Sequence, residues 1–379
     1  MSPLRDKIER EIYEHGPIPF SRYMELCLYD SDLGYYSRNA EQFGKAGDFY
    51  TSSDVHGVFG RLLARQFDEM WRALGSPDRI DLIELGPGRG LFAQDVLDWS
   101  ENKFPDFFHA LRYVLVESSA ALGRKIKANL ARHLESDKAT LTTSWQTARQ
   151  IGTDVPVIVF ANELFDALPV EILSAKGSLR IDTRDHRFIE TWELCSAEEV
   201  EFLDHYSIHP EWNDRVEALL VAQQFMKQIA ATINTGFLLI IDYGYTREEQ
   251  LAGRHRGTLK SIRRHSVTAG PYESPGEQDI TADVNFTALA AAAEHQGMGV
   301  HPLLTQSQLL LGIGEGNQFA DAFEECRLPQ ERAKVALQLK HLVTPAGMGE
   351  SFRAMVGYKQ VTKAIVESLS GLSFNRRAR

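Results

Sequence analysis

The sequence predicts an α/β fold around a mostly parallel sheet, and three observations support this. Strand-like and helix-like segments alternate from Ile80 onward, as in βαβ units. Two strand candidates, VIVFA and FLLIID, are apolar on both faces, as strands buried between layers of helices are. A third, Ile80–Glu84, runs into the glycine-rich turn Gly86–Gly90, and a helix pattern follows over Leu91–Trp99. A strand, a tight turn and a helix in this order predict a Rossmann-like core.

The chain begins with a region, residues 1–75, that is expected to be mainly helical. Apolar residues recur at helical spacing in three stretches. The first begins near Pro3, the second is Phe20–Tyr29 and the third is Val58–Leu74. A segment rich in Gly, Tyr and Ser, Asp30–His56, separates the last two. A loop of this length inside a compact domain is usually functional, and we expect it to cover a bound cofactor.

The middle of the chain, residues 76–245, is expected to form the sheet and to bind the cofactor. Its strand candidates are Ile80–Glu84, Leu111–Glu117, Ala139–Thr143, Val155–Ala161 and Phe237–Asp242. Its helix candidates are Leu91–Trp99, Ala120–Leu134 and Trp212–Ile233. An insertion at about 169–206 alternates polar and apolar residues, which predicts β-hairpins.

Residues 246–379 are expected to complete the sheet and to form a substrate lobe of mixed α and β structure. The strand-like GTLKSI and a helix candidate, Phe286–His295, lie in an insertion. Two further helix candidates and one strand candidate are Asn317–Glu325, Pro329–Leu342 and Phe352–Tyr358. The apolar run Leu309-Leu310-Leu311 fits either an exposed surface for a homodimer or partner, or the buried core.

Composition narrows the class of protein. The 379 residues carry a formal net charge of -11, which gives no sign of the basic face of a nucleic-acid binder. The three cysteines are far apart and form no C-x-x-C pair, so we expect neither a disulfide framework nor a zinc site, and the histidines show no metal-binding spacing. No apolar run reaches transmembrane length, and the first residues do not resemble a secretory signal. These features predict a cytoplasmic protein without membrane insertion.

The spacing of the glycine turn distinguishes two cofactor classes. The dinucleotide fingerprint G-x-G-x-x-G/A, counted from Gly86 and Gly88, would place Gly or Ala at Leu91. The pattern acid-x-G-x-G-x-G, from Glu84 to Gly90, is instead typical of class I S-adenosyl-L-methionine (SAM) methyltransferases.

The candidate cofactor contacts follow from this motif. Glu84 closes its strand and could receive polar groups of the amino-acid part of SAM, and its alternative is a solvated strand end. Glu117 closes the next strand, where an acid in Rossmann-like folds bonds the ribose hydroxyls of either cofactor. Trp145 follows the third strand and either walls the adenine or belongs to the core. The complete set is Glu84, Gly86, Pro87, Gly88, Gly90, Glu117, Tyr50, Thr51 and Trp145.

Candidate catalytic residues follow the fourth strand, at the edge where open α/β sheets hold ligands. Asn162 could accept a hydrogen bond from a substrate N–H, and Glu163 and Asp166 could orient a cationic nitrogen. The structural alternatives are a turn residue for Asn162 and a cap for Asp166. Asp242 and Tyr243 end the fifth strand and are candidates for substrate binding, although a tyrosine there is more often packing.

These motifs together resemble the MidA-like family. The segments that carry the resemblance are HGPIPFSRYMELCLYD, GDFYTSSDVHGVFG, IELGPGRG, ANELFDALPVE, IIDYGY, PGEQDITADVNFTAL and TQSQLLLGIG. The likeness runs from about Ile12 to Tyr358, and Asp279 in GEQDIT is a further candidate for substrate binding. The resemblance implies a class I methyltransferase sheet with a helical N-terminal region and an added lobe.

The resemblance also implies an activity and a partner. The mitochondrial members of the family methylate protein arginine and assist the assembly of respiratory complex I. For this chain we therefore expect SAM as cofactor and a protein arginine as acceptor, with a complex I subunit as one candidate. Carboxylates suit that acceptor because a guanidinium stays charged in proteins and must be held while it loses a proton.

Two other functions stay open from the sequence. One is a non-catalytic assembly factor that retains a SAM-binding fold and grips a partner. The other is a nicotinamide-dependent oxidoreductase, against which Leu91 counts.

Overall fold

The computed structural model describes residues 2–38, 57–150, 155–263, 266–268 and 270–373. They form two compact units. The sheet unit comprises Tyr50–Glu163, Ile229–Tyr243 and Ala293–Arg379. The insertion unit comprises Met1–Phe49, Leu164–Gln228 and Gly244–Ala292. The expected roles of residues 1–75, 76–245 and 246–379 stay predictions, because a division into compact units does not show which residues bind cofactor or substrate.

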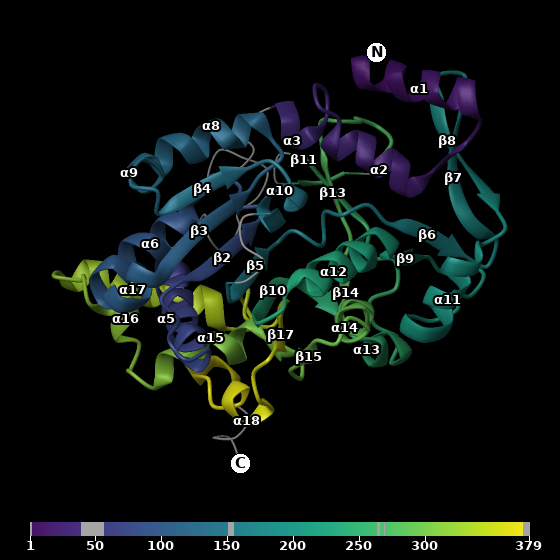
Figure 1. Ribbon diagram of the computed structural model, residues 1–379. Coiled ribbons are helices and arrows are strands. Elements are labelled where there is room, and N and C mark those ends of the chain that lie inside the picture. The colour runs from purple at the N-terminus through teal and green to yellow at the C-terminus, as the bar shows by residue number, and fades with distance from the viewer. Residues whose placement is uncertain (1, 39–56, 151–154, 264–265, 269, 374–379) are drawn as a thin grey trace. The chain divides into compact units, whose positions relative to one another are not determined.

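The sheet unit contains most of the long strands (Figure 1). Its strands are β2 (Ile80–Leu85), β3 (Leu111–Val116), β4 (Ala139–Thr142), β5 (Val157–Asn162), β10 (Gly236–Tyr245), β15 (Gly299–Val300), β16 (Leu304–Thr305) and β17 (Phe352–Lys359). Its helices are α5 (Gly57–Ala73), α6 (Leu91–Lys103), α7 (Pro105–Ala110), α8 (Ala120–Asn129), α9 (Ala131–Glu135), α10 (Trp145–Gln150), α15 (Gln306–Glu315), α16 (Ala320–Phe323), α17 (Pro329–Val343), α18 (Lys363–Val366) and the short helix η2 (Ser370–Leu372).

The order of the strands places a ligand site between β2 and β5. The sheet runs β15-β17-β10-β5-β2-β3-β4, with β10, β5, β2, β3 and β4 parallel and β17 antiparallel to β10. Because β3 lies on one side of β2 and β5 on the other, the chain reverses its direction of growth between β2 and β5. Open α/β sheets bind ligands outside the carboxyl ends of their strands at such a switch point.

The register brings the expected site residues to one edge. Leu85 lies beside Val116 of β3 and Ala161 of β5, and Asn162 lies beside Ile241 of β10. The residues that follow these positions therefore emerge together at the carboxyl edge of the sheet. The α/β class and the parallel core that the sequence predicts are confirmed.

Aromatic packing fixes the helices against this sheet. Phe160 of β5 stacks on Phe92 of α6 with ring centroids 4.5 Å apart. Phe67 of α5 meets the Phe160 ring edge-on, with centroids 5.7 Å apart. All three side chains are buried in one large core cluster. Aromatic pairs of this kind add about 0.5–1.5 kcal/mol beyond their buried area, which holds the start of α6 firmly at the sheet.

The insertion unit is built from short strands and helices. Its strands are β1 (Ile18–Pro19), β6 (Glu171–Ser174), β7 (Gly177–Arg184), β8 (Arg187–Glu193), β9 (Val216–Ala218), β11 (Lys260–Arg263), β12 (Ser266–Val267), β13 (Asp279–Thr281) and β14 (Val284–Asn285). Its helices are α1 (Pro3–His15), α2 (Phe20–Tyr29), α3 (Tyr35–Arg38), α11 (Ala197–Tyr206) and α13 (Arg247–Leu251). Helices α12 (Leu220–Thr232) and α14 (Phe286–Glu294) begin in this unit and end in the sheet unit, whereas β10 runs the other way.

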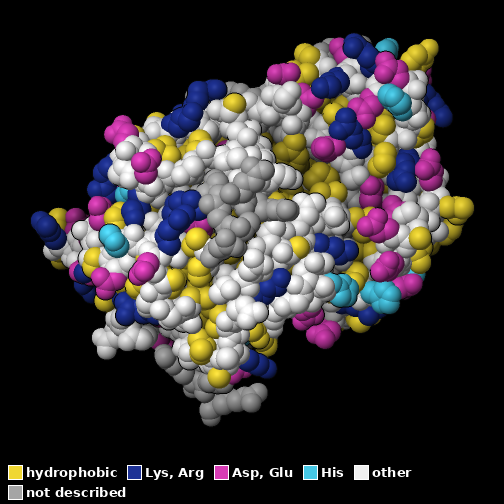
Figure 2. All heavy atoms as spheres, in the orientation of Figure 1, with side chains coloured by type: hydrophobic (Ala, Val, Ile, Leu, Met, Phe, Trp, Pro, Cys, Tyr) yellow, Lys and Arg dark blue, Asp and Glu magenta, His cyan; other side chains and the backbone are white. Residues whose placement is uncertain are grey.

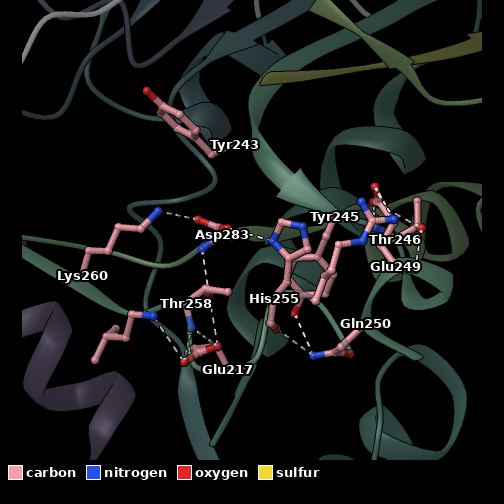
Figure 3. A network of polar contacts seen from close by, with 12 residues as sticks. Glu217, Tyr243, Tyr245, Thr246, Glu249, Gln250, His255, Thr258, Lys260 and Asp283 are labelled. Atoms are coloured by element: carbon pink, nitrogen blue, oxygen red, sulfur yellow. Dashed lines mark hydrogen bonds and ion pairs between the residues drawn. The ribbon is translucent and has the colours of Figure 1, made fainter. Parts of the chain in front are cut away.

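A polar network holds one loop of the insertion unit (Figure 3). The Glu217 carboxylate on β9 is 1% exposed and accepts hydrogen bonds from the backbone N–H of Thr258 at 3.1 Å and of Leu259 at 3.3 Å. The Thr258 hydroxyl also donates to it, and in turn accepts from the N–H of Asp283. The Asp283 carboxylate pairs with Lys260 at 3.0 Å. The network therefore ties β9 to the segment that precedes β11.

Three expectations about secondary structure are wrong. The helix expected over Trp212–Ile233 begins only at Leu220, because Val216–Ala218 pairs as β9 with β6. The hairpin region ends early, since Ser196 starts helix α11 with a capping box. The helix expected over Ala120–Leu134 is interrupted at Leu130, between α8 and α9.

The apolar run Leu309–Leu311 lies in helix α15. Leu309 and Leu310 are fully buried in the core cluster. The helix begins with a capping box in which the Thr305 hydroxyl accepts from the N–H of Gln308. The core alternative is therefore the correct one for these two leucines.

Candidate active site

The turn after β2 is held open by three glycines with positive φ. The φ angles are +66° at Gly86, +55° at Gly88 and +75° at Gly90, a region that costs other residues about 1–2 kcal/mol. The Gly86 N–H donates to Val116 of β3 at 3.0 Å, which anchors the turn to the sheet. A Cβ added at Gly88 would meet nothing within 4 Å, so the described residues leave space above this backbone.

The end of the turn is packed and supplies a helix N-terminus. A Cβ at Gly90 would lie 3.2 Å from the Leu130 side chain and 3.3 Å from that of Ile126, so a larger residue would be crowded there and would also have to adopt the left-handed φ of +75°. Gly90 is also the N-cap of α6, and as a glycine it has no side chain to bond the first amides of the helix. The Asn129 amide donates to the carbonyl of Arg89 at 2.9 Å and fixes the loop. Such an N-terminus favours polar or anionic ligand groups.

Glu84 is a buried acid at the end of β2. It is 4% exposed, and its Oε2 accepts a hydrogen bond from the Tyr113 hydroxyl at 2.8 Å. Burial raises the pKa of Glu84 to about 8, the Tyr113 hydrogen bond lowers that pKa, and the nearby Glu117 raises it. The alternative of a solvated strand end is wrong. The sequence reasoning missed Tyr113, whose side chain lies on the neighbouring strand.

Glu117 follows β3 directly and is bound to backbone amides. It is 8% exposed and accepts from the N–H of Ser119 at 2.8 Å. Burial raises the pKa of Glu117 to about 7, while hydrogen bonds from the backbone of Ser119, Gly88 and Ser118 lower it. One of these donors belongs to the glycine turn, so Glu117 and the turn form one cradle.

Asn162 and Glu163 lie next to the cradle at the end of β5. The Asn162 amide donates to the Glu163 carboxylate at 2.9 Å, and the N–H of Glu163 donates to Ile241 of β10 at 3.0 Å. Glu163 has a φ of +52°. Non-glycine residues in this strained region cluster at functional sites. The buried Oδ1 of Asn162 has no hydrogen-bond partner among the described residues.

Asp242 and Tyr243 end the part of β10 that belongs to the sheet unit. Asp242 is fully buried, and one of its carboxylate oxygens accepts from the N–H of Tyr243 at 2.9 Å. The Tyr243 ring packs on Phe352 of β17 with centroids 3.9 Å apart. The packing that the sequence offered as the alternative for Tyr243 is therefore present.

Trp145 begins α10, directly after the strand that borders β3. Its side chain is 6% exposed, and its indole Nε1 has no hydrogen-bond partner among the described residues. A buried indole N–H usually finds an acceptor. Together with the space above Gly88 and the unpaired Oδ1 of Asn162, this donor fits an edge that receives a ligand with both donors and acceptors.

The remaining candidates lie in the insertion unit or outside the described residues. Tyr50 and Thr51 belong to the latter group. Asp279 on β13 is 3% exposed and accepts from the Tyr36 hydroxyl at 2.8 Å. The carbonyl of Asp166 accepts from Ala282, just beyond β13, at 2.9 Å. The structure thus brings Asp166 and Asp279 to the same strand region, with a tyrosine that the sequence reasoning missed.

Charged groups are mixed on the face of the molecule that Figure 2 shows. In Figure 2, Lys and Arg side chains lie among Asp and Glu side chains rather than in one band. Across the described ranges, no cluster of His, Cys, Asp and Glu could hold a metal ion. In that same part of the chain, no helix is long and apolar enough to cross a membrane.

The fold and the cradle define a class I SAM-dependent methyltransferase, and comparison with known proteins agrees. Residues 62–303 match the family model described as "Putative S-adenosyl-L-methionine-dependent methyltransferase". The chain belongs to this family. SAM is its cofactor, and the residues of the cradle fit it.

Two groups of relatives extend the match. The protein arginine methyltransferase NDUFAF7 homolog of Drosophila melanogaster is 28% identical over 402 aligned residues, which cover 98% of this chain and 88% of the relative. The human protein arginine methyltransferase NDUFAF7 is 27% identical, with 93% of this chain and 82% of the relative covered. A Burkholderia thailandensis structure bound to S-adenosyl-homocysteine superposes with a TM-score of 0.82 at 25% identity, over 98% of this chain and 94% of that chain.

These findings confirm the MidA-like resemblance and decide between the functions left open. They favour the methyltransferase over an oxidoreductase and over a non-catalytic assembly factor. They contradict the expected cytoplasmic location, because the fly and vertebrate relatives are mitochondrial proteins by name. Free thiols fit any reducing compartment, so the cysteines could not identify the location.

Proposed function

We propose that this enzyme transfers a methyl group from SAM to a nitrogen of a protein arginine side chain. The observation that carries the proposal is the pair Asn162–Glu163 beside the cradle. It offers a buried amide oxygen without a partner and a carboxylate held at 2.9 Å from the same amide. The names of the relatives, protein arginine methyltransferases, support this acceptor.

In this proposal the cofactor is held by residues of the sheet unit. Glu84 receives the ammonium group, the amides of the turn Gly86-Pro87-Gly88 and of Gly90 approach the ligand closely, and Glu117 accepts from the ribose. Trp145 borders the adenine, while Tyr50 and Thr51, which lie outside the described residues, stay candidates from the sequence alone. The support for the roles of Glu84, Glu117 and Trp145 is their burial at the carboxyl edge of the sheet, and the support for the turn is the space above Gly88.

The acceptor is oriented by carboxylates and an amide. SAM supplies a methyl group that is already activated on a sulfonium. Asn162 accepts from one guanidinium N–H, and Glu163 takes the proton that the attacking nitrogen loses when its new N–C bond forms. Asp242 and Tyr243 are proposed for the acceptor side, and Asp166 and Asp279, which lie in the insertion unit, are retained as acceptor candidates from the sequence pattern alone. The products are S-adenosylhomocysteine, methylated arginine and a proton passed to solvent.

The test is transfer of labelled methyl from SAM to protein, followed by mass spectrometry of the labelled residue. Paired peptides that differ only by Arg or Lys at the acceptor position separate guanidinium from amine substrates. Methylarginine in the Arg peptide alone supports the proposal, and label on lysine, or on no protein at all while S-adenosylhomocysteine binds, overturns it. A complex I subunit as acceptor and a homodimer stay predictions.

A further inference from the structure

Tyr113 and Glu84 form a buried pair inside the cofactor edge of the sheet unit. Tyr113 is fully buried and Glu84 is 4% exposed. The tyrosine hydroxyl lies 2.8 Å from the Glu84 Oε2. Tyr113 lies beside Leu82 in the parallel register of β2 and β3. Glu84 is two residues beyond Leu82, on the same face of β2. The Tyr113 side chain therefore reaches along the sheet toward its carboxyl edge, where it meets Glu84.

The surroundings of Glu84 hold little other charge. On the β5 side its register partner is Phe160, and on the β3 side it is Leu115. On α6, the carboxylate of Asp95 faces Gly57 and Gly60 of α5. The groups that act on the titration of Glu84 are Tyr113 and Glu117, both from the β3 side. In the described structure no Lys or Arg forms an ion pair with Glu84.

A carboxylic acid in this setting retains its proton at neutral pH until a cation arrives. Burial raises the pKa of Glu84 to about 8. The amino-acid part of the cofactor brings an ammonium group, and an opposite charge nearby favours the ionised acid. The carboxylate then needs a donor to hold its second oxygen in a fixed direction, and the Tyr113 hydroxyl is that donor.

We propose that Tyr113 is a positioning residue for the cofactor, and that Glu84, held by Tyr113, loses a proton to solvent when it receives the cofactor's ammonium group. The proton leaves the Glu84 carboxyl oxygen, and an ammonium–carboxylate ion pair takes the place of the neutral acid. This inference concerns the cofactor and is independent of the acceptor that is methylated.

The experiment is calorimetric titration at about pH 6.5 in two buffers of different ionisation enthalpy, which counts the protons released. S-adenosylhomocysteine, which has the ammonium group, is compared with methylthioadenosine, which has the ribose and adenine but no amino-acid part. The difference between the two ligands isolates Glu84 from Glu117, since both ligands reach the ribose site. The wild-type protein should release roughly one more proton with S-adenosylhomocysteine.

Two variants test the pair from both sides. Glu84→Gln should abolish the extra proton because the amide does not titrate. Tyr113→Phe retains the ring but not the donor, so it should weaken S-adenosylhomocysteine about tenfold and leave methylthioadenosine nearly unchanged. The hydrogen bond from Tyr113 lowers the pKa of Glu84. Without this hydrogen bond, the extra proton should disappear at a higher pH than in the wild-type protein. Titration of the ligand's own amine contributes equally to both proteins and does not affect the comparison.

A matched control is Tyr245→Phe, which removes another buried tyrosine hydroxyl, one that accepts from Gln250 at 3.4 Å. It should change neither affinity nor proton number. Equal proton release with both ligands in the wild-type protein overturns the proposal, as does wild-type affinity in Tyr113→Phe. If Tyr113→Phe also loses methylthioadenosine, the isosteric Glu84→Gln decides by its proton count.

Discussion

The Asn162 side-chain amide donates to the carboxylate of the next residue, Glu163, at 2.9 Å. This contact forms while Glu163 has a left-handed backbone, with φ at +52°. Such a conformation costs a non-glycine residue about 1–2 kcal/mol, so the surrounding structure must hold it. The N–H of Glu163 supplies one restraint through its bond to Ile241. A strained acid that is aimed by its neighbour suits a role in orienting an acceptor.

Replacement of Glu163 tests that role. Glu163→Gln removes the charge and keeps the shape, so S-adenosylhomocysteine should bind within about twofold while methyl transfer falls by about 10²-fold. Transfer is measured as labelled methyl on peptide and binding by calorimetry. Glu163→Gly is the backbone control, since it relieves the left-handed strain and also removes the carboxylate. It should fold at least as stably and be equally slow. A large loss of cofactor binding in Glu163→Gln would show that Glu163 belongs to the cofactor site instead.

Gly88→Ala tests the space above the turn. The new Cβ meets no described atom within 4 Å, so the cost to the free protein is the left-handed conformation alone, about 1–2 kcal/mol in the free energy of unfolding. The same methyl group would occupy the approach to the ligand, and affinity for S-adenosylhomocysteine should fall about tenfold. Gly75→Ala is the control, because Gly75 also has positive φ and open space. It should lose similar stability and no affinity. Equal affinities in the two variants would remove Gly88 from the cofactor site.

The residues at the carboxyl edge could be predicted because they follow strands whose ends are visible in the sequence. A parallel sheet places those ends together whatever the rest of the fold does, so Glu84, Glu117 and Asn162 needed no knowledge of distant contacts. Tyr113 was missed because its role depends on the register between two strands. Its signal is present only once Tyr113 is placed beside Leu82, two residues before Glu84.

The secondary structure that was missed has a similar cause. Val216–Ala218 lies within a stretch with helical periodicity, yet it pairs with β6, whose residue Glu171 lies beside Ala218. Strand propensity depends on such cross-strand contacts, which local periodicity does not report. Helix α11 was different, since Ser196 and Glu199 form a capping box that is readable in the sequence.

Trp145→Phe should have a small effect on stability and a larger effect on cofactor affinity. Its indole N–H is buried without a partner among the described residues, so Trp145→Phe breaks no described hydrogen bond and should cost the ligand-free protein only the packing of the smaller ring, about 1 kcal/mol. If the N–H donates to the adenine, affinity for S-adenosylhomocysteine should fall about three- to tenfold. Thermal or denaturant unfolding and calorimetry measure the two effects.

Trp71→Phe is the matched control for Trp145. The Trp71 indole N–H donates to the carbonyl of Pro77 at 2.9 Å, so its loss leaves a buried carbonyl unpaired. This variant should lose about 1–3 kcal/mol more stability than Trp145→Phe and no affinity for the cofactor. A Trp145→Phe variant that behaves like Trp71→Phe, less stable with unchanged affinity, would show that Trp145 is a core residue.

The polar network of Figure 3 predicts that a substitution at Glu217, in the insertion unit, lowers the stability of the protein. Glu217→Gln replaces one acceptor oxygen by an NH₂ group, which faces the N–H of Thr258 whichever way the amide turns, because that N–H lies 3.1 Å from both carboxylate oxygens. Because Glu217 is 1% exposed, the unpaired donors cannot turn to water, and the free energy of unfolding should fall by about 1–3 kcal/mol. Glu193→Gln is the control, since the Glu193 side chain is 57% exposed and pairs with Arg180 at the surface. It should change stability by less than about 0.5 kcal/mol. Denaturant unfolding measures both, and equal effects would mean that the carboxylate of Glu217 does not hold the loop.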